Sequence, residues 1–336
     1  MIKKTFVIDT AETNPWRNLA LEAFLLEHVP PETCVLYLWQ NRHTVVIGRN
    51  QNARKECRVT ELEAEGGFLA RRLSGGGAVY HDLGNLNFTF LLPADDYDLG
   101  LQTEVILRAA RLLGVDAQRS GRNDIETQGR KFSGNAFYKT GNNSYHHGTI
   151  LVKVDSAAAQ KYLSVSQDKI KAKGVDSVKS RIINLVECNP AITIEKMKGA
   201  MRSCFDEVYQ TEAGALTLEN AGEKLLLPDN FDLVKTIEEH YAVFSSADWR
   251  YGKDPPFEWT ANGRFPWGGI EIRLLVKKNS IEDAAVFSDS MDVEFILALP
   301  DLLRGCVFNE DSIGAKLPDT EASGDMIKLI FGGHDG

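Results

Sequence analysis

The sequence predicts an α+β protein with a large mixed or mostly antiparallel sheet. Runs of β-branched and aromatic residues follow one another through hairpin-type turns and do not alternate with helices in a regular βαβ series. A segment rich in Ser, Gly and Pro, at 245–256, separates a last group of strands and a helix from the rest. We therefore expect a large domain over residues 1–246 and a small α+β domain over residues 247–336.

The helices are predicted from apolar residues at helical spacing and from their caps. Asn14 and Pro15 indicate an N-cap and first helical position, and this helix ends before Pro30. Thr193 is a second expected N-cap. Gly114 is typical of a residue that ends a helix. The apolar stripes predict four further helices, at 101–113, 194–208, 234–244 and 293–303.

The strands are predicted from short β-branched and aromatic runs bounded by turn residues. Residues 34–39 and 44–47 are joined by a turn at 40–43, which predicts a hairpin. Further strands are expected at 69–72, 87–92, 115–117, 124–126, 131–138, 145–154, 270–276 and 285–287.

Composition excludes several classes of protein. A chain of 336 residues with 43% apolar and 25% charged residues has material for two domains and a sizeable core. The net charge of -9 argues against a broad nucleic-acid surface. No apolar run approaches a membrane span, and residues 1–10 lack the apolar region of a secretory signal. A cytoplasmic protein without nucleic-acid or membrane partners is expected, with a monomer as the default.

The five cysteines show no metal or redox spacing. No two of them form a C-x-x-C pair, so neither a zinc site nor a redox pair is indicated. An odd, scattered set is typical of reduced thiols in a cytosol. They are Cys34, Cys57, Cys188, Cys204 and Cys306.

Residues 71–82, R-R-L-S-G-G-G-A-V-Y-H-D, are the most informative segment. Three glycines allow positive φ and a close backbone approach to a ligand, and the preceding arginines favour an anion. Tyr80 stands where a dinucleotide fingerprint needs glycine, and Asn135 stands where a P-loop needs lysine after Gly134. Glycines alone favour a flexible turn; with Arg71, Arg72 and His81 beside them, we interpret the segment as a ligand loop.

Two other segments are basic and rich in small residues. In 129–136, Lys131 and Phe132 point to opposite faces of a strand, so Lys131 faces a surface or a cleft. That segment alone favours a solvated edge lysine. Residues 171–181 hold three lysines and one arginine, either in an anion-binding loop or in an exposed connector. Together with the arginines of the glycine loop, these segments suit a triphosphate site. The pair at His146 and His147 lacks metal-ligand spacing.

The ordered set of motifs resembles the lipoate–protein ligases of the two-domain bacterial type, within the biotin/lipoate ligase superfamily. The resemblance covers nearly the whole chain. The matching segments are 14–22, T-V-V-I-G-R-N-Q-N at 44–52, 71–82, G-R-N-D at 121–124, R-K-F-S-G-N-A at 130–136, H-H-G-T-I-L at 146–151, 174–181 and F-P-W-G-G at 265–269.

The resemblance implies a catalytic domain followed by an accessory domain, and a reaction in two steps. Lipoate and Mg-ATP would give lipoyl-adenylate and pyrophosphate. The lipoyl group would then pass to a lysine of an apo lipoyl domain, in a 2-oxoacid dehydrogenase complex or the glycine-cleavage H protein. Fixed positive charge suits the first step, because two anions must be brought together.

The resemblance also implies the site residues. Lys131 is the expected catalytic residue, and Asp124 is expected to orient Lys131 or Mg²⁺. The expected adenylate-binding residues are Arg72, Gly77, Ala78, Val79, Tyr80, Asp124, Lys131, Gly174, Val175 and Ser180. The expected lipoate-binding residues are Trp39, Arg72, Ser74, Gly75, Gly76, His81, Lys131, Ser133, Gly134 and His147.

Three other functions are weaker. A carrier-dependent octanoyl or lipoyl transferase of the same superfamily uses a cysteine thioester, and no cysteine falls in the motifs around Lys131 or His147. The arginine–glycine repeat of biotin ligases is absent. A non-catalytic module that binds lipoyl-adenylate is disfavoured by the presence of Arg72, Asp124 and Lys131.

Overall fold

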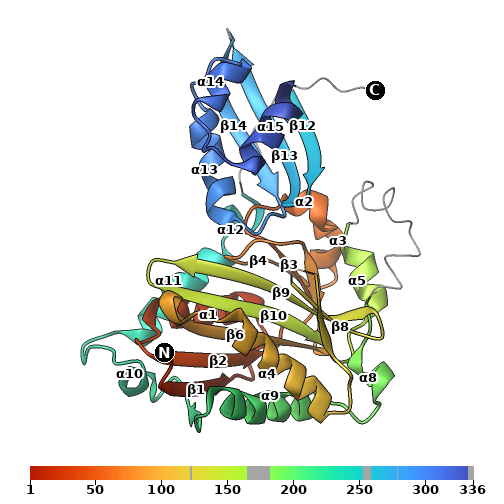
Figure 1. Ribbon diagram of the computed structural model, residues 1–336, viewed down its shortest axis with the longest axis vertical. Helices are drawn as coiled ribbons and strands as arrows, with labels where there is room; N and C mark the ends of the chain where they lie inside the picture. The colour runs from red at the N-terminus through yellow and green to blue at the C-terminus, as the bar shows by residue number, and fades with distance from the viewer. Residues whose placement is uncertain (122, 165–181, 253–258, 278, 332–336) are drawn as a thin grey trace.

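The structure, a computed structural model, describes residues 1–121, 123–164, 182–252, 259–277 and 279–331. Over these residues, an eight-stranded sheet runs in the order β11-β1-β2-β6-β10-β9-β8-β7 (Figure 1). Strand β1 pairs in parallel with β2 and β11, and all other pairs are antiparallel. The strands are β1 (Lys4–Asp9), β2 (Thr33–Trp39), β6 (Asn85–Pro93), β7 (Gln118–Ser120), β8 (Asp124–Thr127), β9 (Arg130–Thr140), β10 (Asn143–Leu151) and β11 (Gly214–Ala215).

Helices cover both faces of this sheet. On one face, α4 (Leu99–Leu112) and α9 (Ile194–Tyr209) pack on Leu36 and Phe88. On the other, α1 (Pro15–His28) and α11 (Leu233–Ser245) pack around Tyr37 and Tyr145. All seven residues of β2 are buried because both of its faces are covered, which explains its continuous apolar sequence.

The expected hairpin at 34–39 and 44–47 is wrong. Strand β3 (Thr44–Ile47) belongs to a second, three-stranded sheet, parallel to β4 (Phe68–Arg71) and antiparallel to β5 (Val79–His81). Both edges of β2 are taken by β1 and β6, so the chain leaves the large sheet at 40–43. The second sheet packs with α2 (Ala53–Glu56), α3 (Val59–Ala64) and α5 (Ser156–Tyr162).

The C-terminal part has its own sheet and core, as expected. It contains the antiparallel strands β12 (Trp259–Phe265), β13 (Gly268–Lys277) and β14 (Ser280–Ser288). The helices are α13 (Val293–Leu303), α14 (Glu310–Gly314) and α15 (Glu321–Phe331), and Ile272 and Leu299 are central in the core. In Figure 1 this C-terminal unit stands above the eight-stranded sheet. The α+β class with a large mixed-sheet unit and a small C-terminal unit is thus confirmed.

The segment between the large N-terminal part and the C-terminal unit is partly helical. Within the expected linker at 245–256, α12 (Ala247–Tyr251) is a short helix, and residues 253–258 lie outside the described part of the chain. The boundary at 246 stays a prediction. The remaining short elements are η1 (Ala94–Asp96), α8 (Leu185–Cys188) and α10 (Ala221–Lys224).

The predicted helices are confirmed, and one predicted strand is wrong. Asn14 and Thr193 cap α1 and α9 as expected. Residues 115–117 are not a strand, because the backbone N–H of Val115 donates to Ala110 O beyond the positive-φ Gly114, and β7 begins only at Gln118. Within the described ranges, no helix has the length and apolarity that crossing a membrane requires.

Candidate active site

One face of the large sheet carries a row of residues in register across five strands. Its members lie on β2, β6, β10, β9 and β8, and they are Trp39, Asn87, Thr149, Gly134 and Asp124. A second row, two residues along, contains Tyr37, Thr89, His147 and Ala136. Both rows share a face because side chains alternate with a period of two.

A cavity of about 180 Å³ lies over this face, many times the space that one water molecule needs. The eight-stranded sheet, α1 and the turn at residues 75–77, which we call the glycine turn, all contribute to its wall. The lining residues are Leu19, Trp39, Val46, Arg72, Gly76, Gly77, Ala78, Val79, His81, Asn87, Asn123, Lys131, Gly134, Asn135, Ala136, His147, Gly148 and Thr149.

Arg72 shapes the glycine turn from inside. Its side chain is buried, and its Nη2 donates to Gly75 O at 2.7 Å and to Gly77 O at 2.8 Å. Gly76 between them has φ of 87°, a conformation that favours glycine. Burial lowers the pKa of Arg72 to about 10, so the guanidinium remains charged at neutral pH. The turn therefore places a fixed positive charge at the cavity wall.

Arg71 and Gly75 face away from the cavity. Arg71 donates to backbone oxygens of Gly48, Arg49 and Gln51, and to those of Trp249 and Arg250 on α12. A Cβ on Gly75 would lie 2.1 Å from Ser290 O of the C-terminal unit. These two residues therefore join the turn to α12 and to the C-terminal unit.

Lys131 reaches the cavity from β9. Its neighbour Phe132 is fully buried, as expected, and the pairing of β8 with β9 shifts register at this point. The amine Nζ lies 2.7 Å from Asp124 Oδ1. A Cβ built on Gly134 would also lie 2.7 Å from this Nζ, which is too close for a side chain at position 134. Strand β9 has β10 and β8 on its two sides, so Lys131 is not an edge-strand lysine. Its ammonium faces the cavity beside a carboxylate.

A buried acid, a histidine of the cavity lining and a buried serine form a chain of hydrogen bonds. Glu22, on α1, has only 1% of its surface exposed. His147 Nδ1 lies 2.8 Å from Glu22 Oε1, and its Nε2 lies 2.8 Å from Ser74 Oγ. Ser74 Oγ also accepts from Arg72 Nε at 3.0 Å. The glycine turn, the sheet and α1 are thereby connected.

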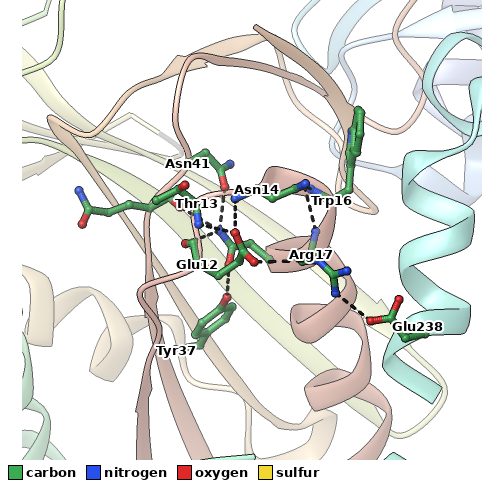
Figure 2. A network of polar contacts seen from close by, with 10 residues as sticks. Glu12, Thr13, Asn14, Trp16, Arg17, Tyr37, Asn41 and Glu238 are labelled. Carbon is green, nitrogen blue, oxygen red and sulfur yellow. Dashed lines mark hydrogen bonds and ion pairs between the residues drawn. The ribbon is translucent and has the colours of Figure 1, made fainter. Parts of the chain in front are cut away.

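His81 is held by a polar network at the start of α1. Asn14 caps this helix, and Arg17 bridges to Glu238 of α11, as Figure 2 shows. In the same network Asn18 donates to Asn41 Oδ1, and Asn41 Nδ2 lies 3.2 Å from His81 Nδ1. Burial, and then the charge of Arg72, lower the pKa of His81 to about 3, so the ring is neutral. Its Nε2 is buried without a partner in the described residues and is available to a ligand.

Two family models match this chain. The model of the lipoyl protein ligase A/B catalytic domain matches residues 14–206, and that of the bacterial lipoate protein ligase C-terminus matches residues 254–329. The chain is 41% identical to a lipoate-protein ligase A of Psychrobacter cryohalolentis over 94% of its own length and 92% of the relative's.

The chain belongs to the lipoate–protein ligase family. Solved structures that are similar to this ligase include the following two. LipL1 of P. falciparum, solved in complex with lipoate, has a TM-score of 0.83 and 28% identity, covering 98% of this chain and 100% of that one. A bipartite lipoate protein ligase of Thermoplasma acidophilum, solved with its E2 lipoyl domain, has a TM-score of 0.63 and 25% identity, covering 76% of this chain and 98% of that one.

Ten of the site residues predicted from the ligase sequence line the cavity. They are Trp39, Arg72, Gly76, Gly77, Ala78, Val79, His81, Lys131, Gly134 and His147. Five others do not line it. Asp124 contacts Lys131, Ser74 contacts His147, Gly75 faces Ser290, Ser133 is buried in β9, and the ring of Tyr80 stacks on Tyr162. Gly174, Val175 and Ser180 lie outside the described residues. Which of these residues bind ligand stays a prediction.

Sequence reasoning missed several residues of this cavity. Asn87, Asn123, Asn135 and Thr149 line it, and Glu22 lies behind its wall. Glu22 offered a usable signal, because it stands three residues after Leu19 on the apolar face of the predicted helix. An acidic residue on a buried face is found paired or hydrogen-bonded. The asparagines gave no such local signal.

Proposed function

We propose that this ligase activates free lipoate with Mg-ATP and transfers the lipoyl group to a lysine of apo lipoyl domains. The observation that carries the proposal is the position of Lys131. Its ammonium projects into a cavity that Arg72 also lines, and Asp124 contacts it at 2.7 Å. Two fixed positive groups at one small cavity suit a reaction that brings two anions together.

In the first step, a carboxylate oxygen of lipoate attacks the α-phosphorus of ATP, and pyrophosphate leaves. Lys131 would contact the carboxylate and the α-phosphate oxygens, because a compact ammonium can donate to both. The ion pair with Asp124 supports the role of that carboxylate in orienting Lys131. Mg²⁺ enters with ATP as part of the substrate. Asp124 remains the candidate to contact this ion.

The glycine turn would accommodate the adenylate. Gly77, Ala78 and Val79 line the cavity, and Gly77 has open space where a Cβ would be. Backbone groups at 77–80 would then follow the edge of the nucleotide. Tyr80 would contribute only backbone, since its ring packs between His43 and Tyr162. Gly174, Val175 and Ser180 would complete the adenylate site.

The other wall would hold the lipoyl group. Leu19, Trp39 and Val46 supply apolar surface there, and Gly76 and His147 complete the lining. His81, neutral and with a free Nε2, would donate to an oxygen of the acyl group. Ser74, Gly75 and Ser133 would act from behind the wall, through the backbone or through the residues that they contact.

In the second step, the unprotonated amine of the acceptor lysine attacks the acyl carbon. The amide bond forms, the bond between the acyl carbon and the bridging oxygen breaks, and AMP leaves with that oxygen and the bonding electron pair. A free lysine has a pKa of about 10.4, so the amine must lose a proton before or during attack. No enzyme nucleophile is needed, because the mixed anhydride is already activated. The proposal also names the acceptors, which are lipoyl domains of 2-oxoacid dehydrogenase complexes and the glycine-cleavage H protein. It further includes a monomeric state and a cytoplasmic location.

Pyrophosphate release tests the proposal. With Mg-ATP and lipoate but no acceptor, the protein should release about one pyrophosphate per molecule, because the adenylate stays bound. Binding of lipoate without this release would favour a non-catalytic module. Acceptor modification from a lipoyl-carrier thioester without ATP would favour a transferase. The cysteines argue against that transferase, since none lines the cavity over the described residues and burial raises the pKa of Cys34 and Cys57 to about 12.

A further inference from the structure

Two chains of hydrogen bonds from different parts of the cavity wall end on one oxygen of Glu22. One chain begins at Arg72 and passes through Ser74 and His147 to Glu22 Oε1, with steps of 3.0, 2.8 and 2.8 Å. The other begins at Trp39, whose Nε1 donates to Thr89 Oγ1 at 3.1 Å, and Thr89 donates to the same Oε1 at 2.7 Å. Glu22 is buried and does not line the cavity itself.

The direction of each bond follows from the carboxylate. An ionised carboxylate only accepts hydrogen bonds, so His147 must carry a proton on Nδ1. In this tautomer Nε2 is the acceptor, and the Ser74 hydroxyl donates a hydrogen bond to it. Ser74 Oγ keeps its lone pairs for the N–H of Arg72. Every group in both chains is satisfied with this arrangement of protons.

The geometry points to Glu22 as a positioning residue for lipoate activation. It fixes the tautomer of His147, and through Ser74 it holds the guanidinium of Arg72 at the glycine turn. Through Thr89 it also holds the indole of Trp39, so one buried carboxylate sets two walls of the cavity. This inference rests on the proposed function, because it assigns Arg72 and Trp39 to the binding of lipoate.

A nucleophilic role for Ser74 is not supported by the same contacts. The order Ser74–His147–Glu22 has the connectivity of a catalytic triad. However, Ser74 is fully buried, it does not line the cavity, and Arg72 Nε already donates to its oxygen. An oxygen enclosed in this way has no path to a substrate carbonyl. The chain therefore positions groups and does not supply a nucleophile.

The tautomer of His147 can be measured without any assay of function. In ¹⁵N-labelled wild-type protein, the ring of His147 should show a protonated Nδ1 and an unprotonated Nε2, and His147→Gln identifies its signals. Glu22→Gln should change this pattern, because the glutamine amide can donate to Nδ1. Asp9→Asn is a matched control, since Asp9 pairs with Lys198 outside the cavity lining and should leave His147 unchanged. A protonated Nε2 in the wild-type protein would overturn the assignment.

Kinetics separate positioning from simple destabilisation. Glu22→Gln should raise the lipoate concentration that gives the half-maximal rate of pyrophosphate release about tenfold or more, while the maximal rate constant of this single release changes less than about threefold. In a His147→Gln background Glu22→Gln should have a smaller effect than in the wild-type protein, because the chain through His147 is already broken and only the chain through Thr89 remains. Equal effects with and without His147, or an unchanged half-saturating lipoate concentration, would contradict the inference. If the wild-type protein released no pyrophosphate with lipoate, the proposed function would fail, and the tautomer would still decide the role of Glu22.

Discussion

The ammonium of Lys131 lies in the space that a side chain on Gly134 would fill. A Cβ built on Gly134 would be 2.7 Å from Lys131 Nζ and 2.8 Å from its Cε. Gly134 also pairs with Asp124 across the sheet, and Asp124 is the carboxylate that contacts the amine. The glycine, the lysine and the aspartate therefore form one unit. Because residue 134 has no side chain, the ammonium of Lys131 has room to lie at this position.

Gly134→Ala should abolish lipoate-dependent pyrophosphate release nearly as completely as Lys131→Ala. The new methyl group displaces the end of a flexible side chain, so the free energy of unfolding should change by no more than about 1 kcal/mol. Gly199→Ala on α9 is the matched control, because no atom lies within 4 Å of its Cβ position. Near-normal pyrophosphate release by Gly134→Ala would show that the position of Lys131 is not critical.

Gly75→Ala should disturb the contact between the glycine turn and the C-terminal unit. Its Cβ would lie 2.1 Å from the backbone oxygen of Ser290, which must move. We expect faster amide exchange at 288–293 and weaker docking of the C-terminal unit, measured by hydrogen exchange and small-angle scattering. Gly77→Ala meets no atom within 4 Å and should leave both observables unchanged. Identical exchange in wild type and Gly75→Ala would contradict this account.

Stability should fall in mild acid because of buried histidines. Burial lowers the pKa of His81 and His146 to about 3, below the value of about 6.5 in an unfolded chain. The contribution of these neutral histidines to the free energy of unfolding is therefore fully present above pH 6.5 and is lost as the pH falls towards 3. Each should reduce the free energy of unfolding by about 1.4 kcal/mol per pH unit in this window. In denaturant titrations between pH 7 and 5, His146→Gln should give a shallower slope than wild type; equal slopes would refute the assignment.

Alkylation of thiols should leave the activity intact. Four cysteines are buried, Cys188 is partly exposed, and burial raises the pKa of Cys34 and Cys57 to about 12. Iodoacetamide on the folded protein should therefore modify mainly Cys188, as peptide mass mapping can check. Pyrophosphate release and acceptor modification should persist. Loss of activity that follows the modification of one cysteine would instead support the thioester mechanism of a transferase.

The helices and the basic segments could be predicted from the sequence because their signals are local. Asn14, Pro15 and Thr193 mark helix starts through bonds within a few residues, and Lys131 alternates with the buried Phe132 along one strand. The motifs from 71 to 151 likewise contain most of the residues that line the cavity. The choice of strand partner was not local. Strand β3 pairs with residues more than twenty positions away, so the apparent hairpin at 40–43 was misleading.

The details of the site also depended on contacts that sequence does not show. Arg71 and Arg72 are adjacent and chemically identical, yet one braces α12 and the other lines the cavity. The glycines at 75 and 77 also have different surroundings, since Gly75 faces Ser290 and Gly77 faces open space. Glu22 and Asn41 act only through residues far along the chain. Local pattern therefore identified the kind of site and not the task of each residue.

The mass of an acceptor domain after incubation shows whether the protein attaches a lipoyl group to it. The protein should be incubated with an apo lipoyl domain, lipoate and Mg-ATP, with parallel reactions that lack ATP or use Lys131→Ala. Lys139→Ala, an exposed lysine of the same strand, serves as the matched variant. We expect a mass gain of one lipoyl group on the domain, which depends on ATP, is retained by Lys139→Ala and is lost with Lys131→Ala. No gain on any of several unrelated apo domains, with folded protein and active substrates, would contradict it.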